Sequence, residues 1–211
     1  MKLRVLVVSA GFVLLACLAP GQENGPTVFL GNQEVRVAGL PALTAPSKNR
    51  PAVLATALEI VLHDKTVCCG KDSALTDAVA YAALSDPLSL KELAAKVSGR
   101  QRTSDDQPIL VDAEYVAGNS ITGDFIVRSL LTQRALVMEW KSHIYVLYGA
   151  LYNEVRDNSG GREFTVVKLY LQDPRFSDEH REVVFNRETD DLAKVQGVLV
   201  ATVKVVPSPW K

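Results

Sequence analysis

Two adjacent cysteines, Cys68 and Cys69, are the residues of this sequence best suited to nucleophilic chemistry. Gly70 follows them, and the alanine-rich sequence from Ser73 onwards predicts a helix. Cys69 would then lie at or just before the helix N-terminus, where exposed N–H groups and the helix dipole stabilise a thiolate. Gly70 would permit a tight entry into the helix and the close approach of a substrate. The alternative is simple burial, because free cysteine is among the most buried residue types.

The second half of the chain offers a histidine and a carboxylate that could assist such a thiol. His143 opens the strand-like segment 143–152, and Asp173 follows the alternating segment 164–171. An imidazolium beside a thiol lowers the pKa of that thiol and can protonate a leaving amine. A carboxylate on the other ring nitrogen fixes the tautomer. Each residue also has a structural interpretation: a histidine satisfied within its strand, and an aspartate that forms a turn before Pro174.

The sequence contains 3 histidines in all, and the other two have weaker claims to chemistry. His180 lies in the charged run 178–182, which predicts a solvated side chain. His63 stands near the two cysteines, but the spacing matches no common zinc pattern and adjacent cysteines are poor joint ligands. We therefore expect neither a metal nor a cofactor.

Residues 1–19 predict a secretory signal peptide. Lys2 and Arg4 precede an apolar run over 5–18 that is too short to span a bilayer comfortably, and Pro20 ends it. Small residues near position 19 suit cleavage there. The sequence thus predicts an exported protein.

A second interpretation of the same region is a bacterial lipobox. Leu14-Leu15-Ala16-Cys17 resembles that motif, in which Cys17 would be lipidated and become the mature N-terminus. The membrane would then be a partner only through this anchor. With either interpretation the mature chain keeps two adjacent cysteines, which excludes a disulfide-stapled scaffold.

The remaining chain is long enough for one domain with a sizeable core. Residues 20–50, rich in Pro and Gly, predict an arm or linker with an edge strand at 28–37. Residues 51–211 form the predicted domain. The net charge is −1, so no electrostatic feature points to nucleic acid as a partner.

Within this domain, helical signals precede strand signals, which predicts an α+β fold with N-terminal helices packed on a C-terminal antiparallel sheet. Ser89 and Glu92 form the capping box of a helix over 88–97. Residues 52–62 are almost continuously apolar and suit a helix or a buried strand equally well. We expect a further helix over 122–133, an exposed polar stretch over 100–107, and strands over 109–116, 135–140, 143–152, 164–171, 183–185 and 198–206.

The order of these parts resembles the papain-like cysteine peptidases, in particular the compact bacterial branch that processes bacteriocin leaders. Cys69-Gly70-Lys71-Asp72-Ser73-Ala74 is similar to the motif that opens the central helix of that family. Residues 136–149 resemble its strand pair with a histidine opening the second strand, and residues 166–174 resemble the strand that ends in Asp-Pro. The resemblance covers about residues 50–175 and implies a papain-like fold with Cys69, His143 and Asp173 as a catalytic triad.

Two positions depart from that family pattern. The family has a glutamine several residues before the cysteine, whose amide donates to the oxyanion, and no glutamine lies between Pro51 and Cys68. His63 stands at about that distance and is the candidate oxyanion donor. The family also has proline two residues after the cysteine, where this chain has Lys71.

The sequence therefore predicts an exported peptidase or amidase that cleaves a peptide or protein substrate through a thiol. The alternative is a catalytically inactive, periplasmic or lipid-anchored binding domain on the same fold, which the missing glutamine favours. A third hypothesis is acyl transfer by the same triad, such as transglutaminase-like crosslinking.

Overall fold

The computed structural model describes residues 28–40, 49–62, 89–102, 108–157, 159–176, 182–186 and 190–206. Its elements in chain order are β1 (Val28–Arg36), α1 (Arg50–Leu62), α3 (Leu90–Val97), β2 (Gly99–Arg102), β3 (Pro108–Ala117), the 3-10 turn η1 (Gly118–Ser120), α4 (Gly123–Leu131), β4 (Leu136–Trp140), β5 (His143–Arg156), β6 (Arg162–Gln172), β7 (Glu182–Asn186), η2 (Leu192–Lys194) and β8 (Val195–Val205).

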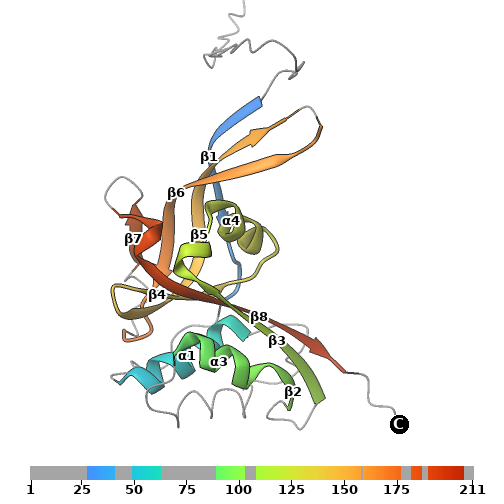
Figure 1. Cartoon of the computed structure of the whole chain (residues 1–211), viewed down its shortest axis with the longest axis vertical. Helices are drawn as coiled ribbons and strands as arrows, with labels where there is room; N and C mark the ends of the chain where they lie inside the picture. Colours follow the sequence, from blue (N-terminus) through green and yellow to red (C-terminus); the bar gives the residue numbers. More distant parts are fainter. Residues whose placement is uncertain are drawn as a thin grey trace, which may run out of the picture.

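The described strands form one antiparallel sheet in the order β2-β3-β8-β4-β5-β6-β7. β5 is long enough to carry two partners along one edge: β4 pairs with its first residues, and β1 pairs with residues 149–156. β6 pairs along the opposite edge of β5. Figure 1 shows the consequence, because β1 and the β5–β6 hairpin extend together away from the end that carries α1 and α3.

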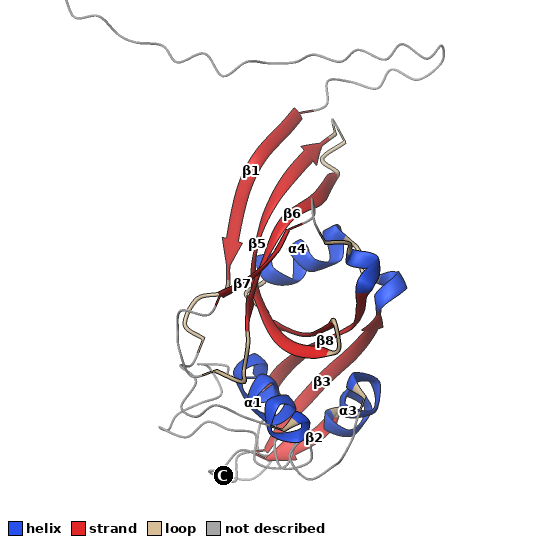
Figure 2. Cartoon of the chain, turned by 90° about the vertical axis from the view of Figure 1, so that its left-hand side faces the viewer, coloured by secondary structure: helices blue, strands red, loops and turns tan. Residues whose placement is uncertain are grey.

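Alternate residues of the central strands face two separate cores, because side chains of a strand point to opposite faces in turn. Ile144 and Val146 of β5 pack in the core with α1 and α3, whereas Tyr145 and Leu147 pack in the core with α4. Helices therefore cover both faces of the sheet, α1 and α3 on one and α4 on the other (Figure 2). Because this strand is buried on both faces, residues 144–147 form a continuous run of apolar and aromatic side chains.

Local capping interactions determine where the helices begin and end. Ser89 and Glu92 form the predicted capping box of α3, and Gly99 follows the helix with φ +110°, a conformation that favours glycine. Thr122 caps α4 by accepting from the N–H of Phe125 at 3.1 Å. The apolar segment 52–62 is helical, and Arg50 at its start contacts Glu139 of β4 at 2.9 Å.

The α+β class is confirmed, but the predicted separation of N-terminal helices from a C-terminal sheet is wrong. β1, β2 and β3 all precede residue 134, and they join the same sheet as the later strands. The predicted strands over 28–37 and 109–116 are present as β1 and β3. β2, with the sequence Gly-Arg-Gln-Arg, lies in the stretch predicted to be exposed and polar. It was missed because an edge strand can pair through its backbone without an apolar side chain.

The predicted centre of the sheet is confirmed: β5 lies between β4 and β6. In the part of the chain that the structure describes, no helix has the length and apolar character needed to cross a membrane.

Candidate functional site

His143 is placed by a tight turn between β4 and β5. It pairs with Trp140 across that turn, and the two intervening residues, Lys141 and Ser142, have φ values of 52° and 62°. Two consecutive residues with positive φ characterise the two-residue hairpin turn whose twist matches that of the flanking strands. His143 is exposed at the end of the hairpin.

Asp173 is placed by the end of β6 and is one of two buried charged residues in the described chain, with 4% of its surface exposed. It accepts a hydrogen bond from the backbone N–H of Arg175 at 3.0 Å. The guanidinium of Arg175 also donates to Asp173, from Nε to the two carboxylate oxygens at 2.9 Å and 3.1 Å and from Nη2 to Oδ2. Arg175 thus neutralises the charge of the buried carboxylate.

The same guanidinium reaches His143. Nη1 of Arg175 lies 3.2 Å from Nδ1 of His143. A guanidinium carries donors only, so Nδ1 must be the acceptor and carries no proton. The proton of the neutral ring is therefore on Nε2. Arg175 stands between the histidine and the aspartate and has a hydrogen bond to each.

Tyr145 completes this group of polar side chains. It is buried, and its pKa is raised mainly by burial and also by the nearby charge of Asp173, while Arg175 opposes both effects. The pKa of Arg175 is raised, chiefly by its hydrogen bonds to Asp173. We call His143, Tyr145, Asp173 and Arg175 the Arg175 cluster.

Aromatic packing fixes the turn end of the β4–β5 hairpin next to this cluster. Trp140 packs against Phe185 of β7 at 5.2 Å between ring centroids and against Tyr145 at 5.9 Å. Lys141 lies over the Trp140 ring at 4.0 Å and pairs with Asp190 at 3.0 Å. The hairpin that presents His143 is thus held in place from several directions.

The structure brings His143 and Asp173 to the same end of the sheet, with Arg175 between them. This convergence follows from the β5–β6 register, since Val146 pairs with Gln172. The predicted nucleophile Cys69, its neighbour Cys68, the oxyanion candidate His63 and the lipidation candidate Cys17 lie outside the described residues.

Arg175 was not identified from the sequence. The signal available was Asp173-Pro174-Arg175, in which an aspartate can accept from the backbone N–H two residues later. That pattern predicts a turn but does not show where the arginine side chain lies.

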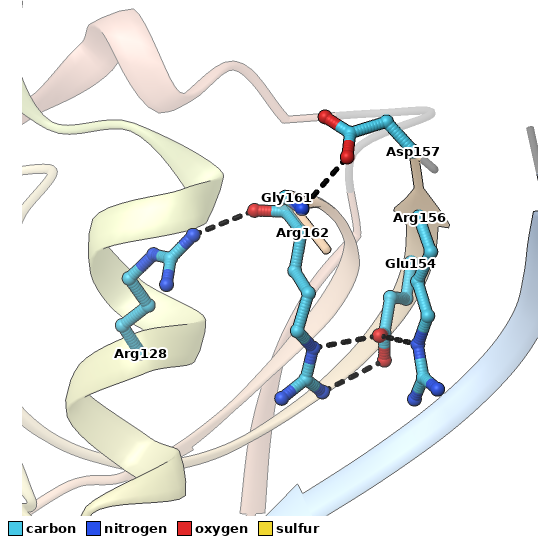
Figure 3. Close-up of polar contacts among 6 residues, drawn as sticks. All are labelled: Arg128, Glu154, Arg156, Asp157, Gly161 and Arg162. Carbon is cyan, nitrogen blue, oxygen red and sulfur yellow. Dashed lines mark hydrogen bonds and ion pairs between the residues drawn. The ribbon is translucent and has the colours of Figure 1, made fainter. Parts of the chain in front are cut away.

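A second polar cluster lies on the β5–β6 hairpin, where Figure 3 shows two arginines converging on Glu154. Arg162 contacts both carboxylate oxygens, at 2.7 Å and 3.0 Å, and Arg156 contacts one of them. These hydrogen bonds, that of Arg162 first, lower the pKa of the buried Glu154 to about 2. Arg128 of α4 donates to the backbone carbonyl of Arg162 at 2.6 Å and so ties the helix to the hairpin. We call Glu154, Arg156 and Arg162 the Glu154 cluster.

Across the described ranges, no three His, Cys, Asp or Glu side chains are grouped so that they could hold a metal ion. Comparison with known proteins found no matching family model, curated protein or solved structure. The chemistry of the Arg175 cluster itself is therefore the basis for a functional proposal.

Proposed function

We propose that this chain is an exported binding domain without thiol catalysis, built on the α+β fold described above. The observation that supports this proposal is the position of Arg175, which binds Asp173 with its Nε and Nη2 and His143 with its Nη1. The candidate partner, which follows from the sequence resemblance, is a peptide or protein.

An imidazolium carries a proton on each of its two ring nitrogens. A thiolate–imidazolium pair needs one ring N–H for the sulfur and the other for the carboxylate. Arg175 faces Nδ1 with a donor, so a proton on Nδ1 would bring two N–H groups into opposition and two positive charges together. Asp173 meanwhile accepts from Arg175 rather than orienting the ring.

The sequence contributes a second, independent argument. No glutamine precedes Cys68 at the position where the resembling peptidases have their oxyanion donor. Loss of one such donor costs about 3–4 kcal/mol of transition-state stabilisation, or roughly 10²–10³ in rate. Together with the blocked imidazole, this loss favours binding over catalysis.

A second candidate is the exported papain-like peptidase or amidase with Cys69, His143 and Asp173 as its triad. The observation that favours it is that His143 and Asp173, 30 positions apart in the chain, have a common hydrogen-bond partner. Displacement of the Arg175 side chain would release both residues from their common partner.

Alkylation kinetics separate the two candidates. The mature protein is treated with iodoacetamide at pH 6, where an ordinary thiol reacts slowly, and the modified cysteine is identified by peptide mass spectrometry. The binding-domain proposal predicts that Cys69 reacts no faster than a free cysteine peptide, and that peptides and acyl esters are not turned over. Fast alkylation that is abolished in Cys69→Ala, with Cys68 unreactive, would reject it in favour of the peptidase.

Export is tested separately, on the same preparation. The intact mass of the mature protein is expected to lack residues 1–19, or residues 1–16 with a diacylglyceryl group on Cys17. Recovery of intact Met1 from the native host would contradict export.

A further inference from the structure

We propose that Arg175 is a blocking residue: its side chain alone keeps Asp173 from pairing with His143 and sets the tautomer of that histidine. This inference concerns the second candidate function, whose triad would include both residues, but its structural content does not depend on catalysis. Arg175 acts through His143 and is therefore a positioning residue.

The geometry that carries this inference is the division of the guanidinium between two partners. Nε and Nη2 face the carboxylate of Asp173, and Nη1 faces Nδ1 of His143. The guanidinium group thus lies between the buried carboxylate and the ring nitrogen and contacts both. The side chain of Arg175 is 33% exposed, against 4% for Asp173, so its outer edge faces solvent and its inner edge faces the carboxylate.

Removal of the guanidinium would leave Asp173 as a buried charge without a cationic partner. Such a charge is costly, so a nearby donor is drawn towards it. Besides the backbone N–H of Arg175, two side chains near the carboxylate could donate to it: the Tyr145 hydroxyl, beside Asp173 and Arg175, and the ring of His143. Lys141 is paired with another carboxylate, that of Asp190. His143 is exposed at the hairpin end, so its ring can turn towards the carboxylate most easily.

The expected consequence is a change of tautomer. With Arg175 in place, Nδ1 accepts and Nε2 carries the proton. With Asp173 as the new partner, Nδ1 must donate, so the neutral ring carries its proton on Nδ1. A free histidine has no such partner to move the proton to Nδ1, so this change would report the new pair specifically.

The test uses the mature full-length protein and Arg175→Met, which removes the donors and keeps an unbranched apolar side chain. Ring ¹⁵N shifts of His143 at pH 8 report which nitrogen is protonated. We expect the proton on Nε2 in the unaltered protein and on Nδ1 in Arg175→Met. Arg50→Met is the matched control, because Arg50 is also 33% exposed and pairs with a carboxylate, but with that of Glu139 rather than with the Arg175 cluster.

If Arg175→Met does not fold, Arg175→Lys is used for the same measurement. A lysine can keep a charge beside Asp173 but lacks the planar fork that serves two partners, so His143 is again expected to be released. A proton that stays on Nε2 in both variants, or a change that also occurs in Arg50→Met, would overturn the proposal.

Alkylation of the same variants separates this inference from the function. A change of tautomer with faster alkylation of Cys69 at pH 6 supports both the blocking role and the peptidase candidate. A change of tautomer without faster alkylation supports the blocking role and rejects that candidate.

Discussion

The two arginine–carboxylate clusters at opposite ends of β5 use the same chemistry with different stoichiometry. In the Glu154 cluster two arginines converge on one buried carboxylate, and each of its oxygens has a guanidinium partner. In the Arg175 cluster one arginine is divided between a buried carboxylate and an exposed imidazole. The first arrangement satisfies the carboxylate with arginines alone. The second makes the state of a titratable ring depend on one arginine side chain.

The burial of the two carboxylates explains why each has arginine beside it. Glu154 is 2% exposed and Asp173 is 4% exposed. An isolated buried carboxylate would be neutralised by protonation or drawn to water, and a cationic partner avoids both outcomes. The arginines themselves are between 33% and 51% exposed, so each covers its carboxylate while staying in contact with solvent.

The largest difference between the clusters is expected for the acidic residues. Glu154→Gln should lower the free energy of unfolding by about 3 kcal/mol, because a buried amide NH₂ would then oppose guanidinium donors and two charge-assisted contacts would be lost. Urea unfolding followed by circular dichroism measures this change. A loss below about 1 kcal/mol would show that the Glu154 cluster does not support the hairpin.

Asp173→Asn is the matching substitution in the Arg175 cluster, with an expected loss of about 2 kcal/mol. The effect is smaller because one arginine, rather than two, loses its anionic partner, and because the asparagine oxygen can still accept from the backbone N–H of Arg175. The same urea titration measures this loss of unfolding free energy. A larger loss than for Glu154→Gln would reverse the comparison.

Acid should destabilise the protein partly through Glu154. Its pKa is lowered in the folded protein to about 2 from an ordinary value of 4.5, so its contribution to stability is complete above pH 5 and is lost as the pH falls towards 2. Glu154→Gln lacks this contribution at every pH. The difference in unfolding free energy between the two proteins should therefore shrink between pH 5 and pH 2, and a constant difference would contradict the account.

The smallest effects are expected for single arginines of the Glu154 cluster. Arg162→Met should lower the unfolding free energy slightly, because Arg162 contacts both carboxylate oxygens, and Arg156→Met should lower it less. Each leaves the other arginine on Glu154, and both side chains are more than a third exposed, so solvent screens the loss. Thermal denaturation of the two variants and of the double variant measures this redundancy. Strictly additive losses would contradict it.

The ion pairs of the two clusters could not be predicted from the sequence alone. The apolar pattern of β5 was apparent as far as residue 152, but the strand continues through Glu154 to Arg156, where a buried carboxylate replaces an apolar side chain. An ion pair across neighbouring strands permits that replacement, and a pattern based on hydrophobicity along one strand does not detect it.

The elements with strong local signals were predicted well. The capping box of α3, the turn after β6 and the central place of β5 each depend on residues close together in the chain. Two elements were harder to predict. The apolar segment of α1 becomes a helix rather than a strand because of its tertiary packing. The edge strand β2 forms through backbone pairing with β3. The convergence of His143 and Asp173 could be predicted from the hairpin register, whereas the side chain of Arg175 between them could not.

The central claim is that Arg175 donates to Nδ1 of His143, and NMR can detect that hydrogen bond directly. The measurement is a nitrogen–nitrogen correlation across the hydrogen bond in the unaltered ¹⁵N-labelled protein at pH 8, together with the protonation site of the ring. The account predicts a correlation between Nη1 of Arg175 and Nδ1 of His143, with the ring proton on Nε2. A proton on Nδ1, with no correlation to Arg175, would contradict it.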